Sequence, residues 1–182
     1  RPHRRAGKAP PRIRWTRGAA GLPLGPMFKV ELKRSHAVPV AAGHPWVFAQ
    51  AVAQLHGRPE AGDEVVVVDP FGKAHGRGYW SPGSAIVVRI LTSDPERALD
   101  GTFFRERLVA AQATRALLGL PSAETTGYRL VHAEGDGLAG LIVDVYGDVL
   151  VVQLLTAGMQ RRKSEVVAAL VDLESGAVGT DV

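Results

Sequence analysis

The residues of this chain most suggestive of chemistry are three glycines in the stretch HAEGDGLAGLIVDVYGD, residues 132–148. Gly135, Gly137 and Gly140 have G-x-G-x-x-G spacing, which in a dinucleotide-binding loop follows a strand and opens a helix. Here the strand-like YRLVHA precedes the glycines, but the Ile- and Val-rich LIVDVYG and DVLVVQLL follow them. A strand, a glycine turn and a second strand form a hairpin, which has no helix dipole to offer a phosphate. The pattern therefore predicts a turn with positive φ angles and no cofactor-binding residue.

Other reactive side chains predict neither a catalytic site nor a metal site. The chain has no cysteine, which excludes disulfides and thiolate chemistry within these 182 residues. Asp136, Asp144 and Asp148 surround the predicted hairpin, but no His or Glu stands beside them at metal-ligand spacing, and turns favour Asp. We predict no catalytic residue and no metal ligand in this chain.

The positive charge is concentrated at the N-terminus. The net charge is +4, yet residues 1–26 hold seven Lys or Arg and no acid, so residues 27–182 hold 15 basic and 18 acidic residues, a net charge of −3. We expect a disordered basic tail, because the segment is rich in Pro, Gly and Arg and has no apolar period. It is either an arm that touches nucleic acid or an extension upstream of a natural start at Met27.

The elements that must position these residues fall into two groups. FKVELK alternates as a strand, EVVVVD and AIVVRIL are buried-strand runs, and a strand from Gly76 to Trp80 lies between them. A loop with Pro39, Gly43 and Pro45 leads into a short helical or irregular turn at WVFAQAVAQL. These elements predict a small barrel of mixed strands over residues 28–92.

The second group predicts an α/β unit. Asp100 or Thr102 is a plausible N-cap for a helix over 103–118, and a second helix is expected near 161–174. Between them we predict strands near 128–133, 140–146 and 149–155. The final AVGTDV resembles the start of a further strand, so we expect the second unit to be incomplete.

Two stretches resemble a known family. LKRSHAVPVAAGHPWVF with GRGYWSPGSAIVVRIL resembles the PUA domain of bacterial 23S ribosomal RNA cytosine-5 methyltransferases of the RlmI-like class. FFRERL and YRLVHAEGDGLAGLIVDVYGDVLVVQLLTAGM resemble the middle domain of the same proteins, with Ala139 where the family usually has proline. The resemblance implies an α+β fold with a tail at 1–26, a PUA-like RNA-binding domain at 27–97 and a middle α/β domain at 98–182, truncated before a Rossmann-like domain.

In a PUA domain, a glycine-containing loop lies against the RNA backbone. The resemblance places Gly43, His44 and Trp46 in that loop, and Lys33 and Arg34 before it add charge for phosphate. His44 is alternatively a surface residue, and Trp46 and Phe48 are more naturally core anchors. Lys73, His75 and Arg77 alternate along one strand and form either a phosphate-tracking stripe or a solvated face. Arg161, Arg162 and Lys163 stand at a predicted helix start, where the helix dipole disfavours positive charge. This indicates an anionic partner, although the cost is small enough for exposed residues to be tolerated without one. The RNA-binding residues expected from the sequence are Lys33, Arg34, Gly43, His44, Trp46, Lys73 and Arg77.

The resemblance also implies a function. We expect the RNA-binding portion of an S-adenosylmethionine-dependent 23S rRNA (cytosine-5) methyltransferase, acting in the cytoplasm on ribosomal RNA, with no membrane partner and a homodimer left open. The catalytic cysteines and the cofactor site of the family have no counterpart here, so the chain alone is expected to bind no S-adenosylmethionine and to be inactive. The alternative is a free-standing, non-enzymatic PUA-type RNA-binding protein.

Overall fold

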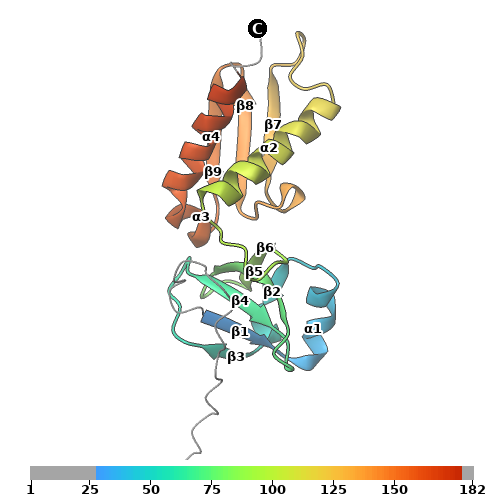
Figure 1. The fold of residues 1–182 in the computed structure, drawn as a ribbon, viewed down its shortest axis with the longest axis vertical. Helices are drawn as coiled ribbons and strands as arrows, with labels where there is room; N and C mark the ends of the chain where they lie inside the picture. The colour runs from blue at the N-terminus through green and yellow to red at the C-terminus, as the bar shows by residue number, and fades with distance from the viewer. Residues whose placement is uncertain (1–27, 178–182) are drawn as a thin grey trace, which may run out of the picture.

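The computed structural model describes residues 28–177, with side chains to residue 175. The predicted basic tail at 1–26 lies outside the described residues, as does the predicted strand start at 177–182 except for Ala177, which ends α4. Two units follow each other along the chain, joined by the segment after residue 92 (Figure 1). Within residues 28–177, no helix combines the length and the apolar character needed to cross a bilayer.

The first unit is a curled sheet of six strands with one short helix packed at its end (Figure 1). The strand order is β2-β6-β5-β4-β1-β3, with β1 and β4 parallel and the remaining neighbours antiparallel, so the sheet is mixed as predicted. Its elements are β1 (Phe28–Leu32), α1 (Arg34–Ala41), β2 (Trp46–Phe48), the 3-10 turn η1 (Ala49–Ala51), β3 (Val52–His56), β4 (Glu64–Val68), β5 (Ala74–Trp80) and β6 (Ile86–Thr92).

The core of the first unit comes from the strands that read as apolar runs. Val30 and Leu32 of β1 and Val65 and Val67 of β4 are fully buried, at alternate positions that face the same side of the sheet. Val66 of β4 is also buried, so this strand is covered on both faces, as its unbroken valine run predicts.

The loop predicted around Pro39 is wrong for its first half, because residues 34–41 form the helix α1 with Pro39 inside it. A proline removes one helical hydrogen bond, which a short helix packed against a core can tolerate. The helix ends where the backbone N–H of Ala42 donates to Val38 O and that of Gly43 donates to Val40 O. The positive φ of Gly43, 94°, allows this ending.

The second unit is a three-stranded antiparallel sheet, order β7-β8-β9, with helices on one face (Figure 1). The predicted α+β architecture is confirmed. Asp100 is the N-cap of the first long helix, and its carboxylate accepts from the backbone N–H of Phe103 at 3.0 Å. The elements are α2 (Gly101–Leu117), β7 (Gly127–His132), the 3-10 turn η2 (Ala133–Asp136), β8 (Leu141–Tyr146), β9 (Val149–Leu154), α3 (Ala157–Arg161) and α4 (Lys163–Ala177).

The glycine motif lies in a hairpin between β7 and β8. After η2, Gly137 and Gly140 take φ angles of 67° and 86°, and β8 begins at Leu141. The prediction of a glycine turn followed by a strand is confirmed, and no helix opens at Gly140. The described strands of the second unit pair only antiparallel, whereas a nucleotide cofactor is typically presented by a parallel sheet.

Candidate functional site

The glycine loop between α1 and β2 is open to solvent. Gly43 and His44 are exposed, and a Cβ built at Gly43 would meet no atom within 4 Å. The backbone N–H of His44 donates to Pro39 O, so the loop is anchored on α1. An exposed, anchored glycine lets an extended ligand such as a phosphodiester backbone approach the main chain closely.

Exposed basic side chains also stand at the other end of α1, at its start. Lys33 and Arg34 are exposed, and the Arg34 guanidinium carbon lies 5.7 Å from the centroid of the Phe71 ring. Phe71 is 78% exposed and belongs to the β4–β5 turn that also carries Lys73. In the described part of the chain, no carboxylate forms an ion pair with Lys33, Arg34 or Lys73. These three residues form what we call the basic patch.

Arg77 does not belong to the basic patch, and its prediction as an RNA contact is wrong. Its side chain is only 2% exposed, and Nη1 donates to Glu64 Oε2 at 3.4 Å. His75, on the same face of β5, hydrogen-bonds Asp69 Oδ2 through Nε2 at 3.1 Å and is almost buried. The alternation along β5 correctly places these side chains on one face, but that face points into the protein.

Trp46 joins the two units. Its indole N–H donates to Glu134 Oε1 at 2.9 Å, and Arg89 Nε lies 3.7 Å from the same oxygen. The Trp46 ring also makes edge contacts with His44 and Phe48, at centroid distances of 5.8 and 6.3 Å. Trp46 therefore has a structural role, as one reading of the sequence expected. The sequence did not predict that this side chain contacts the glycine-motif hairpin through Glu134.

A cleft of about 360 Å³ separates the glycine loop from that hairpin. Its lining includes Gly43, His44 and Pro45 of the first unit, Arg107 and Glu134 of the second unit, and residues at the end of β6. Its size matches a small organic ligand or a nucleotide. Neither Arg107 nor Glu134 carries a local signal that would mark it as a site residue in the sequence.

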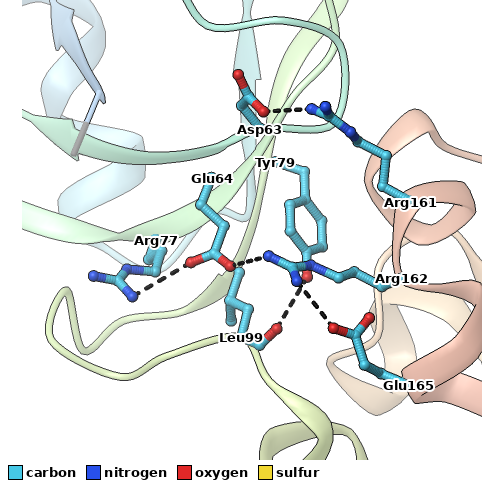
Figure 2. Close-up of polar contacts among 8 residues, drawn as sticks. All are labelled: Asp63, Glu64, Arg77, Tyr79, Leu99, Arg161, Arg162 and Glu165. Atoms are coloured by element: carbon cyan, nitrogen blue, oxygen red, sulfur yellow. Dashed lines mark hydrogen bonds and ion pairs between the residues drawn. The ribbon is translucent and has the colours of Figure 1, made fainter. Parts of the chain in front are cut away.

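The cations at the second predicted helix pair with the first unit. The helix is in fact two helices, α3 and α4, with Arg162 between them. Arg161 pairs with Asp63, and Arg162 Nη2 donates to Glu64 Oε1 at 2.6 Å (Figure 2). The anionic partner suggested by the sequence for Arg161 and Arg162 is therefore the acidic start of β4, about a hundred residues earlier.

Tyr79 completes this junction. It lies on β5 but belongs to the same hydrophobic cluster as Phe104 and Met159 of the second unit. A Cβ on Gly158 would lie 2.2 Å from the Tyr79 ring, so only glycine lets α3 approach this closely. Burial raises the pKa of Tyr79, and its hydroxyl points at Leu99 O, 3.5 Å away (Figure 2).

The aspartates near the hairpin are held by arginines. Arg115 donates two hydrogen bonds to Asp136, at 2.5 and 2.8 Å, and Arg129 pairs with Asp144 at 2.8 Å. Burial raises the pKa of Asp136, but hydrogen bonds from Arg115 and the His132 backbone N–H outweigh it and hold the pKa below its ordinary range. Asp136 thus stabilises η2, and Asp144 stabilises β8.

This pairing predicts acid sensitivity. A carboxyl whose pKa is lowered on folding stabilises the protein above its unfolded pKa of about 3.9, and this contribution is lost as the pH falls through the folded pKa. We expect Asp136→Asn to be less stable than the wild type near neutral pH, and the difference in free energy of unfolding to shrink as the pH falls below about 3.9. Urea unfolding across pH measures this, with Asp148→Asn on the exposed β8–β9 turn as control. If the stability difference between Asp136→Asn and the wild type does not shrink on acidification below about pH 3.9, the assignment is contradicted.

The comparisons with known proteins agree with this geometry. Residues 30–93 match the family model of a PUA-like domain. The chain is 44% identical to the ribosomal RNA large subunit methyltransferase I of Shewanella denitrificans over 143 residues, which is 78% of this chain and 36% of that protein. The protein of the same name from Tolumonas auensis is 44% identical over 71% of this chain and 32% of its own length. The chain thus spans about a third of the curated relatives that it matches.

A solved structure shares the fold. It comes from Streptococcus mutans, carries the name of an S-adenosylmethionine-dependent methyltransferase, and superimposes with a TM-score of 0.72 at 19% identity. The match covers 82% of this chain and 38% of that one. The resemblance read from the sequence, to the RlmI-like class, is confirmed.

Proposed function

We propose, from the similarity of this chain to the ribosomal RNA large subunit methyltransferase I proteins, that it is the RNA-binding portion of an rRNA methyltransferase of the RlmI-like class. The observation that carries the proposal is the basic patch. Three exposed cations, two at the start of α1 and one on the β4–β5 turn, belong to a unit whose match is to a PUA-like domain. Cations without carboxylate partners are available to phosphates, which dominate RNA affinity.

Within this proposal the residues have distinct roles. Lys33, Arg34 and Lys73 neutralise phosphates, and Gly43 lets the RNA backbone approach. His44 donates a hydrogen bond at the edge of the cleft. The division near residue 97 separates this RNA-binding unit from the middle unit that supports it. The RNA is ribosomal, by analogy with the named relatives, and the 23S molecule in the cytoplasm is its expected source.

We further propose that the whole enzyme transfers a methyl group from S-adenosylmethionine to C5 of a cytosine. The attack on C6 by a cysteine thiolate, which such a transfer needs, is supplied outside these 182 residues, since they include no cysteine. The relatives, about three times longer than the matched region, support this division.

The first test removes the basic patch. Changing Lys33 and Arg34 together to Ala should weaken binding of a 23S rRNA fragment about tenfold at moderate salt, because two phosphate contacts are lost. The slope of log affinity against log salt should become shallower by roughly 1.5. The matched control changes Arg105 and Lys163, exposed cations of the second unit, to Ala. Equal binding by the two double variants would contradict the proposal.

The second test addresses the cofactor. Isothermal calorimetry of the purified chain with S-adenosylmethionine should give no saturable heat, and a tritiated-methyl assay on unmodified 23S rRNA should give no incorporation. The reasons are the missing thiolate and the hairpin that contains the glycine motif. Saturable binding of the cofactor would place a cofactor site within these residues and contradict the division.

A further inference from the structure

The cleft between the units is lined by both charged and hydrogen-bonding side chains, whereas the basic patch presents only cations. Arg107 of α2 lines it, and its guanidinium carbon lies 5.4 Å from the centroid of the Phe103 ring. Among the described residues no carboxylate forms an ion pair with Arg107. Gly137 lies against the same guanidinium, since a Cβ there would be 3.3 Å from Nη1. Arg107 is therefore a cation held between Phe103 and Gly137 that lines a nucleotide-sized space.

Glu134 also lines this cleft, and one of its carboxylate oxygens has no hydrogen-bond donor among the described residues. Its Oε1 accepts from the Trp46 indole N–H at 2.9 Å and faces Arg89. In the part of the chain that the structure describes, no donor is within hydrogen-bonding distance of Oε2. A carboxylate oxygen fixed in this way is a ready acceptor for the amino group of a base.

His44 is the third polar side chain that lines the cleft. The backbone N–H of Trp46 donates to its Nδ1 at 3.2 Å, so the neutral ring carries its proton on Nε2 and can donate there. Pro45, Ile90 and Ala139 add apolar surface between the polar groups. The cleft thus combines a cation, an acceptor, a donor and apolar walls, which are the groups that hold an unpaired nucleotide in RNA-binding proteins.

We propose that this cleft binds one unpaired ribonucleotide of the RNA, with Arg107 on its phosphate and Glu134 accepting from the exocyclic amino group of its base. The inference rests on the proposed function and adds to it a preference among the bases of the RNA. Cytosine presents an amino group on its pairing edge, whereas uracil presents a carbonyl oxygen at the same position, which repels a carboxylate. The site therefore selects amino-bearing bases over uracil.

The test compares the hexaribonucleotides C6 and U6, which have the same charge and little structure. The wild-type chain should bind C6 about tenfold more tightly than U6 by fluorescence anisotropy. Glu134→Gln keeps an acceptor for Trp46 but presents an N–H in place of the free oxygen, so it should lose or invert this preference. Arg107→Gln should weaken both oligonucleotides alike, while the control Arg105→Gln, exposed on the same helix, should not.

A second measurement is made on the wild-type chain, and a variant serves only to assign one signal. In a ¹H–¹⁵N spectrum of the wild-type chain, the Trp46 indole signal should shift on adding C6, because its acceptor is Glu134; Trp46→Phe assigns the signal. The inference is overturned if C6 and U6 bind equally, or if Arg107→Gln matches Arg105→Gln, while the Lys33 and Arg34 double variant still weakens binding. If the Lys33 and Arg34 double variant also binds RNA as tightly as the wild type does, the proposed function itself is overturned.

Discussion

Replacing Gly158 with alanine is expected to lower the free energy of unfolding by about 3 kcal/mol, the upper end for inserting one methyl group into a packed site. The added Cβ would lie 2.2–2.4 Å from Cβ, Cγ and Cδ2 of Tyr79, and Tyr79 is only 2% exposed. The ring has no free space to move into, so α3 must shift away from β5. Thermal and urea unfolding measure the loss.

The matched control for this change is Gly101→Ala. Gly101 is the first residue of α2, its φ is not positive, and a Cβ there would meet nothing within 4 Å. Alanine is the better helix former, so this variant should be unchanged or more stable by up to about 1 kcal/mol. If Gly158→Ala is as stable as Gly101→Ala, the two units are not packed through Tyr79 as described.

Replacing Arg162 with methionine is expected to cost about 1–2 kcal/mol, between the values for exposed and buried ion pairs. The change removes the hydrogen bonds from Arg162 to Glu64, at 2.6 Å, and to Glu165, at 3.0 Å (Figure 2). Glu64 keeps Arg77 as a partner, which limits the loss. Because Arg162 is partly exposed, the cost should shrink as salt is raised.

Arg97→Met is the control for this second change. Arg97 pairs with Glu106 at 2.8 Å, but that pair is more exposed and joins two neighbouring parts of the chain. Its loss should cost less than about 0.5 kcal/mol. Equal thermal midpoints for Arg162→Met and Arg97→Met would show that the Arg162–Glu64 pair does not hold the units together.

The sequence predicted most strands because their signals are local. Valine runs at 64–68 and 86–92 and the glycine turn at 135–140 each specify a strand or a hairpin without help from distant residues. The helix at 34–41 was missed because Pro39 was read as a loop signal, although the helix is stabilised by packing of Val40 against the core. In this segment the packing of the helix against the core outweighs the low helix propensity of proline.

The site was only half predictable. Lys33, Arg34 and Gly43 are marked by charge and by a glycine at a loop, and the structure places them on the surface. Arg77 was misjudged because alternation gives a shared face but does not say which face is buried. The Trp46–Glu134 contact joins residues 88 positions apart, and no local pattern announces such a contact.

We expect the described residues 28–177, and not the basic segment 1–26, to bind RNA. The direct measurement is the affinity of a labelled 23S rRNA fragment, across a salt series, for the chain with and without residues 1–26. We expect the shortened chain to keep most of its affinity, and the Lys33 and Arg34 double variant made in it to lose about tenfold. If removing residues 1–26 abolishes binding, while the double variant of the whole chain binds as the wild type does, the RNA-binding surface is not the basic patch.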